Sequence, residues 1–394
     1  MEAPGSVLLI TPRWKRDGGV AAHVESSVAT LRAAHVRVTV LVARVESDTR
    51  IEGVELLESR SLFKRELPMS ERLGPAHGRD ADIIHINQLD DPELITHLGR
   101  SAPVALSAHG FIACTSGVHY FGPGQECQRA HGPGCVARLP RCAHVRNPRG
   151  LPPAYAQASR AVQALHRADA AISYSTAVDR HLEINGVPRR HIVPYFPTMD
   201  ARPGERHERR RRVVFAGRIV ASKGVGTLLE AARSLDAEFV VCGDGRELPA
   251  MRRRAGRLGV EERVRFTGWL GPAELAAQFG DASVIVVPSL WPEPFGLVGI
   301  EGFAAGRPAV ASDTGGIRDW LEHGVSGLVV PAGNGAALAG ALEELLGDPV
   351  RQHEMGEAGR RSLAGRFTAE RHLEMLLGAY AGARRHWERA DAGT

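Results

Sequence analysis

The feature that most constrains this chain is a regular alternation of short apolar, β-branched runs with longer Ala-rich segments of helical period. Such alternation is typical of βαβ units, in which parallel strands are covered by helices. It continues through the whole chain, so each half predicts its own doubly wound parallel sheet. The expected strands span residues 7–10, 36–42, 83–86, 104–107, 170–173, 192–194, 213–216, 238–241, 264–266, 284–287, 309–311 and 327–330.

The chain divides at a segment whose composition is that of a linker. Its 394 residues suffice for two domains, since a domain averages about 150 residues. Between the two groups of strands, residues 195–212 combine prolines and a glycine with a run of charges over 206–212. Arginines there can bind phosphate, but a solvated hinge is the preferred interpretation. We expect an N-terminal domain over 1–200 and a C-terminal domain over 201–366.

The last segment, residues 367–394, predicts a single amphipathic helix. Leu373, Leu376 and Tyr380 recur at helical spacing, and Thr368 is suited to cap the first turn. The apolar face of this helix must be buried against one of the domains.

Charge and hydropathy exclude several classes of protein. The 49 basic and 45 acidic residues are spread along the chain and leave a net charge of +4, which argues against a dedicated nucleic-acid-binding protein. The longest apolar runs have strand length, far short of the roughly 20 residues of a membrane-spanning helix. The N-terminus lacks the features of a secretory signal, so we expect a cytoplasmic protein. Residues 61–67 are basic and partly apolar, and a surface helix or loop is preferred there over a peripheral membrane contact.

Residues 111–153 interrupt the alternation, because they are rich in Gly, Pro, Cys and His and have no period. Irregular loops of this length are uncommon within a compact domain and are usually functional. The odd total of five cysteines argues against structural disulfides. The cysteines and histidines have the ligand chemistry of Zn²⁺ but form no CxxC pair, so a structural zinc site and a set of free cysteines both remain open. The residues concerned are Cys114, Cys127, Cys135 and Cys142, with His119, His131 and His144 between them.

A basic loop follows the expected strand 213–216. Arg218 and Lys223 lie five residues apart, flanked by Gly217 and Gly224, where the strand passes into a helix. A guanidinium fork and an ammonium near a helix N-terminus bind anions well, so the loop predicts a diphosphate site rather than a turn with two exposed charges. Only three of the 49 basic residues are lysines, and Lys223 is the only one in the second half.

A second loop, after the expected strand 284–287, carries two glutamates. Prolines on both sides hold Glu293 in an extended conformation, and residues 295–297 then open a helix that contains Glu301. Carboxylates in these positions can bind the hydroxyls of a sugar and of a ribose. A carboxylate at a helix start can equally serve only as a cap.

Taken together, the two loops resemble the retaining glycosyltransferases of family 4, the group 1 glycosyl transferases. Arg218, Lys223, Glu293 and Glu301 stand in the family's order, as does the Ser-Asp-Thr-Gly-Gly sequence at 312–316. The match covers nearly all of the second half. The resemblance implies the GT-B fold, in which two Rossmann-like doubly wound domains face a central cleft and the C-terminal helix crosses back to the N-terminal domain.

The resemblance also implies roles for residues of the second half. Arg218 and Lys223 would stabilise charge on the diphosphate, Glu293 would bind the donor sugar, and Glu301 would bind the ribose. The further donor contacts that it implies are Gly243, Gly245, Trp269 and, through their backbone, Phe295, Gly296 and Leu297.

In the first half the resemblance is carried by two short motifs. Residues 17–20 look like the family's glycine loop, in which N–H groups of Gly18 and Gly19 approach the donor diphosphate. The His-Gly pair at His109, after the fourth expected strand, looks like the histidine that lines the transfer site. Without the family context, His109 is equally a packed residue at a strand end.

The implied activity is transfer of a sugar from a nucleotide-diphosphate sugar to an acceptor hydroxyl, with retention at the anomeric carbon. The acceptor stays open among glycans, lipid-linked acceptors and small natural products. The resemblance implies no required cofactor, and the leaving phosphate itself takes the proton of the incoming hydroxyl. Asp80 and Asp82 form an Asp-x-Asp pair, but they lead directly into the strand 83–86 and are interpreted as a strand start, not a catalytic metal site.

Other functions fit the sequence less well. A nucleotide-sugar epimerase of GT-B shape would release an epimerised sugar without an acceptor, and a non-catalytic subunit would bind the nucleotide sugar without turnover. A pyridoxal-phosphate phosphorylase needs a Schiff-base lysine, and Lys223 already lies in the diphosphate loop. A nicotinamide dehydrogenase has little support because no GxGxxG fingerprint occurs. The combination of Arg218, Lys223, Glu293 and Glu301 favours the transferase.

Overall fold

The computed structural model describes residues 3–14, 18–46, 50–87, 91–114, 120–122, 125–138, 142, 151–199 and 211–392. The chain forms two compact units. The N-terminal unit comprises Met1–His119, Gln128–Tyr195 and Ala369–Thr394, and the C-terminal unit comprises Tyr120–Cys127 and Phe196–Thr368. Among the sequence features discussed above, Asp17, His119, His144 and the charged run 206–210 lie outside the described residues.

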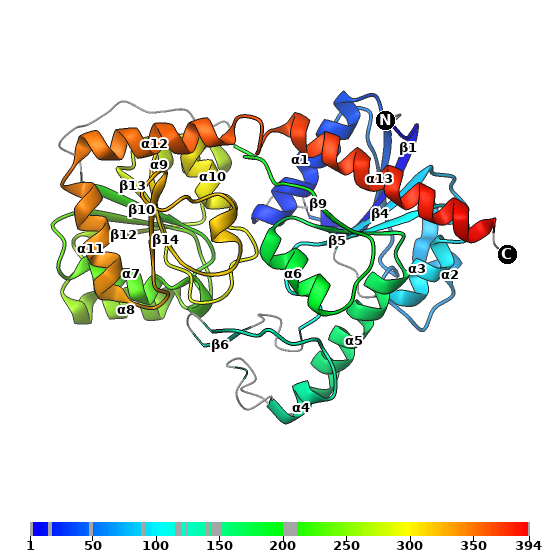
Figure 1. The fold of residues 1–394 in the computed structure, drawn as a ribbon, viewed down its shortest axis with the longest axis horizontal. Helices are drawn as coiled ribbons and strands as arrows, with labels where there is room; N and C mark the ends of the chain where they lie inside the picture. Colours follow the sequence, from blue (N-terminus) through cyan, green and yellow to red (C-terminus); the bar gives the residue numbers. More distant parts are fainter. Residues whose placement is uncertain are drawn as a thin grey trace. The chain divides into compact units, whose positions relative to one another are not determined.

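The N-terminal unit is built on a parallel sheet with the strand order β3-β2-β1-β4-β5-β8-β9. Figure 1 labels β1, β4, β5 and β9 among these strands. Every strand pair in it is parallel. Its central strands are buried along nearly their whole length, as expected where helices cover both faces of a sheet. The strands are β1 (Ser6–Trp14), β2 (Arg37–Val45), β3 (Glu55–Glu58), β4 (Ile83–Asn87), β5 (Val104–Ala108), β8 (Ala170–Ser173) and β9 (Arg190–Ile192).

The helices of this unit begin at residues that suit helix starts. Asp91 caps α3 by accepting the N–H of Leu94, and Ser175 caps α6 by accepting the N–H of Val178. The helices are α1 (Gly19–Ala33), α2 (Met69–Leu73), η1 (Gly74–Ala76), α3 (Pro92–Leu98), α4 (Gly134–Arg138), α5 (Leu151–Arg167), α6 (Thr176–Ile184) and α13 (Ala369–Asp391).

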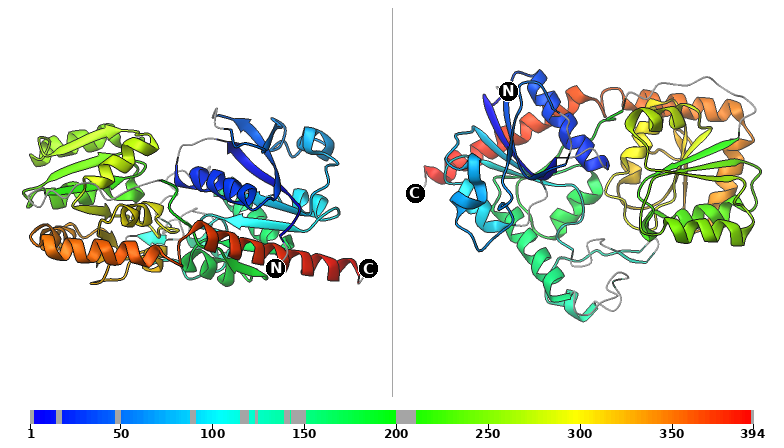
Figure 2. Two further views of the ribbon diagram at one scale, coloured as in Figure 1. Left: turned by 90° about the horizontal axis from the view of Figure 1, so that it is seen from above. Right: turned by 180° about the vertical axis from the view of Figure 1, so that it is seen from behind.

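The last helix, α13, returns to the N-terminal unit. It packs against α1, β5 and β8 (Figure 1 and Figure 2). Leu376 and Tyr380 on its apolar face are both 1% exposed. The expected crossover of the C-terminal helix is therefore confirmed.

The C-terminal unit is built on a second parallel sheet, with the strand order β12-β11-β10-β13-β14-β15. This is the doubly wound order in which the chain starts in the middle of the sheet and reverses its direction of winding between β10 and β13. The strands are β10 (Arg212–Ala216), β11 (Glu238–Cys242), β12 (Val264–Gly268), β13 (Val284–Val287), β14 (Ala309–Ser312) and β15 (Gly327–Val330).

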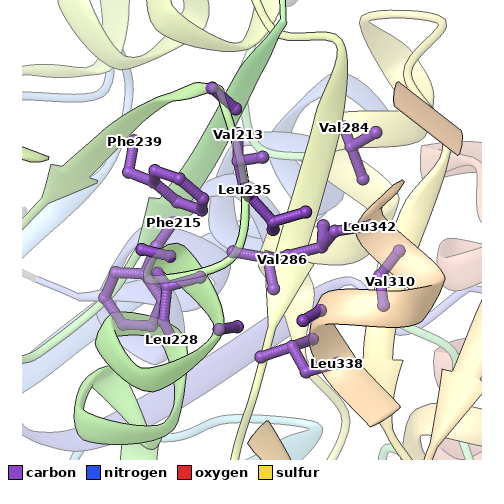
Figure 3. Packing of buried hydrophobic residues seen from close by; sticks show 14 of the residues in the cluster. Val213, Phe215, Leu228, Leu235, Phe239, Val284, Val286, Val310, Leu338 and Leu342 are labelled. Carbon is purple, nitrogen blue, oxygen red and sulfur yellow. The ribbon is translucent and has the colours of Figure 1, made fainter. Parts of the chain in front are cut away.

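Helices of the C-terminal unit close its core. Figure 3 shows Val213, Phe239 and Val286 of the strands packed with Leu228 of α7 and Leu342 of α11, and all five side chains are at most 1% exposed. The remaining elements are η4 (Ala221–Lys223), α7 (Val225–Ala232), α8 (Leu248–Leu258), α9 (Pro272–Gly280), α10 (Leu297–Ala304), η5 (Gly315–Asp319), α11 (Gly335–Leu346), α12 (Pro349–Leu363) and the hairpin strands β6 (Tyr120–Gly122) and β7 (Gln125–Glu126).

The fold class expected from the alternation is confirmed, and every expected strand is present. One strand is displaced: the sequence predicts a strand at 192–194, whereas β9 covers Arg190–Ile192, because Pro194 has no N–H to donate to a ladder. The edge strand β3 and the hairpin β6–β7 are additions that the sequence does not predict. The central cleft between the two halves stays a prediction.

Candidate functional site

The candidate site lies at the carboxyl edge of the C-terminal sheet. Open α/β sheets bind ligands where the direction of winding reverses, here between β10 and β13. Backbone hydrogen bonds join the carboxyl ends of three neighbouring strands, β10, β11 and β12, beside this point. Gly217 donates its N–H to the Cys242 carbonyl at 2.9 Å, and Gly243 donates to the Gly268 carbonyl at 2.8 Å.

Lys223 and Glu293 form an ion pair across this switch point. Lys223 ends η4 in the loop after β10, and Glu293 lies in the loop after β13. Lys223 Nζ lies 2.7 Å from both Glu293 Oε1 and Glu293 Oε2, and 5.5 Å from the centre of the Trp291 ring. Two side chains that sequence reasoning selected from separate loops are therefore in direct contact.

Glu293 is buried at 6% exposure and fully hydrogen-bonded on one oxygen. Ser289 Oγ donates to Oε2 at 2.8 Å, and Trp291 Nε1 donates to the same oxygen at 3.2 Å. Burial alone raises the pKa of Glu293, but Lys223 and these donors outweigh it and hold the pKa below its usual value. The carboxylate is therefore ionised at neutral pH. Among the described residues Oε1 is bound by Lys223 only, so it is the oxygen with capacity for a further donor.

The turn after β14 supports the backbone of the Glu293 loop. Gly316 donates its N–H to the Glu293 carbonyl at 2.7 Å. Gly315 has a φ of +59°, and a Cβ there would lie 2.1 Å from the same carbonyl oxygen. Trp320 Nε1 donates to the Phe295 carbonyl at 2.7 Å. The carbonyl of Phe295 is thus used within the protein.

Glu301 lies in α10, whose first residue Leu297 follows Gly296 at a φ of +91°. The Glu301 side chain is 8% exposed, and its Oε1 accepts a hydrogen bond from Thr198 Oγ1 at 3.0 Å. Burial raises the pKa of Glu301 to about 7, while the Thr198 hydroxyl acts in the opposite direction. Further hydroxyl donors at this carboxyl would favour its charged form.

The other expected donor residues lie along the same edge. The Arg218 side chain is exposed and makes no hydrogen bond or ion pair with another described residue. A Cβ on Gly243 would lie 1.9 Å from the Gly217 carbonyl oxygen, and one on Gly245 would overlap Ile219, so glycine is required where these loops touch. Trp269, which follows β12, is 50% exposed. Their contacts with a ligand stay predictions.

In the N-terminal unit, Gly18 and His109 lie at carboxyl ends of strands. Gly18 has a φ of +96° and precedes α1, with open space around the position of a Cβ. His109 is 4% exposed; its Nδ1 lies 2.8 Å from Tyr195 Oη and its Nε2 lies 2.9 Å from Asn87 Oδ1. The ring also stacks on Tyr174.

Both ring nitrogens of His109 are therefore engaged within the protein. Burial lowers the pKa of His109 to about 3, with His85 and His372 adding to the effect, so the ring is neutral. Asn87 Nδ2 is buried without a hydrogen-bond partner among the described residues. This packed arrangement agrees with the alternative interpretation of His109 as a strand-end residue, and its role at a transfer site stays a prediction.

Sequence reasoning missed several residues that contact the site. Ser289 and Trp291 lie close to Glu293 in sequence, and polar side chains next to the motif were a usable signal. Thr198 reaches Glu301 over 103 residues of chain, and Glu126 reaches Gly315 over 189 residues. No pattern local to either residue indicates such a contact.

A structural zinc site at the cysteines stays a prediction. Within the described ranges, which include all four cysteines, no group of three or more His, Cys, Asp or Glu side chains could hold a metal ion. Cys127 belongs to the C-terminal unit, whereas Cys114, Cys135 and Cys142 belong to the N-terminal unit.

The Asp-x-Asp pair serves the sheet. Asp82 Oδ2 accepts the N–H of Ser6 at 2.9 Å, and the Asp82 N–H reaches Ser6 Oγ at 3.1 Å. These bonds join the segment before β4 to the start of β1, as the strand-start interpretation expects. Of the helices in the described part of the chain, none combines the length and the apolar character needed to cross a membrane.

Comparisons with known proteins find relatives for the C-terminal part of the chain. Residues 199–362 match the family described as Glycosyl transferases group 1. The chain is 33% identical over 191 residues to alpha-D-kanosaminyltransferase of Streptomyces kanamyceticus, covering 46% of this chain and 49% of that protein. It is 35% identical over 221 residues to D-inositol 3-phosphate glycosyltransferase of Geodermatophilus obscurus, covering 50% and 48%. The chain thus spans about half the length of these curated relatives.

Solved structures match nearly the whole chain at low sequence identity. Sucrose-phosphate synthase from Thermosynechococcus elongatus has a TM-score of 0.71 at 20% identity, covering 99% of this chain and 100% of that one. Anabaena Alr3699/HepE, in complex with UDP and glucose, has a TM-score of 0.71 at 17% identity, covering 95% and 99%.

The fold defines a chain of the GT-B class, with two Rossmann-like units. Within that class, residues 199–362 form a group 1 glycosyl transferase domain, and the family resemblance drawn from the motifs is confirmed.

Proposed function

We propose that this chain is a retaining glycosyltransferase, which moves a sugar from a nucleoside-diphosphate sugar to a hydroxyl of an acceptor. The observation that carries the proposal is the Lys223–Glu293 pair at the switch point, with Glu301 in the helix that follows the same loop. Two neighbouring loops and the helix α10 thus supply three groups: a cation for a diphosphate, a carboxylate for a sugar and a second carboxylate for a ribose.

The relatives support the same class of donor and leave the acceptor open. Two of them are named for glycosyl transfer, and Alr3699/HepE holds UDP and glucose. The acceptors in the relatives' names differ widely: one is inositol 3-phosphate, and another, in a mannosyltransferase of Mycobacterium leprae, is phosphatidyl-myo-inositol. A glycan, a lipid-linked acceptor and a small molecule therefore all stay open for this chain.

Lys223 and Arg218 would stabilise the leaving diphosphate. An ammonium has three N–H donors, and the Glu293 carboxylate lies within reach of two of them, so one remains for a β-phosphate oxygen. Arg218 offers an exposed guanidinium from the same loop. Negative charge grows on the leaving phosphate in the transition state, and fixed positive charge beside it lowers the barrier.

Glu293 would orient the donor sugar. Its Oε1 can accept a sugar hydroxyl, whereas Oε2 is saturated by Lys223, Ser289 and Trp291. A carboxylate held in this way is a poor nucleophile. The proposal is therefore that the acceptor attacks on the face that the diphosphate leaves, and that the leaving phosphate takes the hydroxyl proton, with retention as the result. Since Lys223 and Arg218 supply positive charge, we propose that transfer needs no metal.

A thermal-shift panel tests donor binding. A ligand that binds only the folded state raises its stability by RT ln(1 + [L]/Kd). We expect nucleoside diphosphates and their sugars to raise the melting temperature of the C-terminal unit more than the matching monophosphates do. The control variant Glu262→Gln, at an exposed position away from the loops of the site, should show the same shifts as the wild type. If no nucleotide shifts the transition, the proposal is wrong.

Product analysis separates transfer from the alternatives. A transferase releases nucleoside diphosphate in step with acceptor glycosylation, and NMR of the product gives the anomeric configuration. An epimerase releases an altered free sugar without acceptor, and a binding subunit gives no product. Activity that is unchanged by EDTA supports the metal-independent mechanism, and activity lost with EDTA and restored by Mn²⁺ contradicts it.

A further inference from the structure

A hairpin from the irregular segment 111–153 belongs to the C-terminal unit. Residues Tyr120–Cys127, which contain β6 and β7, group with this unit although the flanking chain on both sides belongs to the N-terminal unit. At its end, Glu126 Oε1 accepts the backbone N–H of Gly315 at 2.7 Å, from 189 residues away in sequence. The segment that broke the βα alternation therefore contributes a side chain to the turn after β14.

That turn lies directly against the backbone of Glu293. Gly315 leaves no room for a Cβ beside the Glu293 carbonyl, and Gly316 donates its N–H to this carbonyl at 2.7 Å. The side chain of the same glutamate binds Lys223. A continuous path of contacts thus runs from Glu126 through the two glycines to the ion pair at the switch point.

The hydrogen bond from Gly315 to Glu126 is of a strong kind. A carboxylate that accepts a backbone N–H forms a charge-assisted bond, which is shorter and stronger than a neutral one. It matters at this position because two successive glycines have little intrinsic preference for one backbone conformation. The Glu126 carboxylate adds an acceptor from outside the turn to the bond that Gly316 makes with Glu293.

We propose that Glu126 is a positioning residue of the nucleotide-sugar site, which holds the Gly315–Gly316 turn and thereby the backbone of Glu293. This role rests on the proposed function of that site. The hairpin β6–β7 would then support the loop whose Glu293 binds the donor sugar. Donor affinity then depends on a segment outside the nucleotide-binding fold.

Three variants of the full chain test the contact itself. Glu126→Ala removes the acceptor, Glu126→Gln keeps an acceptor oxygen for the Gly315 N–H, and Glu262→Ala removes a carboxylate at an exposed control position. Hydrogen exchange of a peptide covering residues 313–320 reports on the turn and needs no substrate. We expect exchange there to become about tenfold faster in Glu126→Ala, to rise by less in Glu126→Gln, which loses only the charge assistance, and to stay unchanged in Glu262→Ala. Unchanged exchange in Glu126→Ala would overturn the proposal whatever the protein's activity.

Donor kinetics then test the positioning role. We expect the donor KM to rise about tenfold in Glu126→Ala and to return near the wild-type value in Glu126→Gln, while the acceptor KM stays constant. If exchange responds but the donor KM does not, the positioning role is wrong. If Glu126→Gln raises the donor KM as much as Glu126→Ala while exchange in the turn stays at the wild-type rate, the charge acts on the donor directly and the proposal is also overturned. A wild-type protein without donor turnover contradicts the proposed function instead, and the exchange result still stands.

Discussion

Lys223 has two roles, one in turnover and one in stability. Lys223→Ala removes the cation that faces the diphosphate, and loss of one such contact costs about 10² to 10³ in rate. It also leaves Glu293 buried without its counter-ion, which destabilises a protein by about 3 kcal/mol. We therefore predict both a loss of turnover and a lower melting temperature, measured by donor hydrolysis and by thermal unfolding.

The double variant Lys223→Ala/Glu293→Gln separates these effects. Since it removes the uncompensated charge, we expect most of the lost stability to return while turnover stays low. The matched single control is Lys64→Ala at an exposed position of the N-terminal unit. Wild-type turnover in Lys223→Ala would contradict the role of the ammonium.

Glu301 combines binding with a cost in stability. Its pKa is raised from the usual 4.5 to about 7, so the folded chain holds this proton between these values while the unfolded chain releases it. The contribution of Glu301 to stability is therefore most favourable at low pH and falls as pH rises from 4.5 to 7, by about 3 kcal/mol in total.

We predict that Glu301→Gln is more stable than wild type at pH 8 without ligand and equally stable at pH 4.5. The same variant should lose the stabilisation that a nucleoside diphosphate gives, because a neutral amide accepts ribose hydroxyls poorly. Thermal unfolding at both pH values, with and without ligand, measures both effects. Lower stability of the unliganded variant at pH 8 would show that burial does not penalise this carboxylate.

At the residue scale, the sequence predicted side chains that stand within recognisable loops. Lys223 and Glu293 were chosen from separate motifs, and their contact follows from strand order. Thr198 and Glu126 were not predictable, because each acts on a distant residue through one hydrogen bond and has no distinctive neighbours. The burial of His109 among Tyr174, Tyr195 and Asn87 depends on tertiary packing that no local pattern encodes.

At the element scale, the loop that carries Lys223 depends on Gly224. This glycine follows η4 and precedes α7 with a φ of +71°, and a Cβ there would lie 1.8 Å from the Pro288 carbonyl oxygen. Gly259 has a φ of +67° with open space around it. The two positions share a backbone conformation and differ in crowding, which makes Gly259→Ala the matched control.

We predict that Gly259→Ala costs about 1 kcal/mol, from backbone strain alone. Gly224→Ala adds the displacement of the loop against Pro288, so we expect a cost of about 3 kcal/mol or more together with loss of donor binding. Denaturant unfolding and nucleotide titration measure these effects. Equal costs in the two variants would mean that the close approach to Pro288 is relieved without moving the loop.

The elements themselves were largely predictable, because buried parallel strands are apolar runs of strand length. The edge strand β3, with glutamates at both of its ends, has no such signal. The hairpin β6–β7 consists of very short strands within a Gly/Pro-rich stretch. The composition of the same segment also does not say which unit each cysteine joins, and Cys127 belongs to a different unit from Cys114, Cys135 and Cys142.

At the scale of the whole molecule, burial shifts pKa values in both units, and it acts on histidines in the N-terminal unit and on Glu301 in the C-terminal unit. His23, His85, His109 and His372 are all buried in the N-terminal unit. His85 contacts Tyr380 Oη and Ser107 Oγ, and His372 contacts the Pro194 carbonyl and Ser27 Oγ. Burial lowers the pKa of His85 to about 3 and of His372 to about 4. The C-terminal unit instead buries Glu301, whose pKa is raised.

These shifts predict that acid affects the two units in opposite directions. Between pH 6.5 and 5 the unfolded chain protonates each buried histidine while the folded N-terminal unit does not, so this unit loses about 2 kcal/mol per histidine. Over the same interval folded Glu301 takes up a proton that the unfolded chain does not, and the C-terminal unit becomes more stable.

Calorimetric scans at pH 7.5 and 5 should therefore show the transition of the N-terminal unit falling and that of the C-terminal unit holding or rising. His85→Gln, whose amide can still bond Tyr380 and Ser107, should reduce the acid sensitivity of the falling transition only. A parallel fall of both transitions, unchanged by this variant, would show that the buried histidines do not govern acid stability.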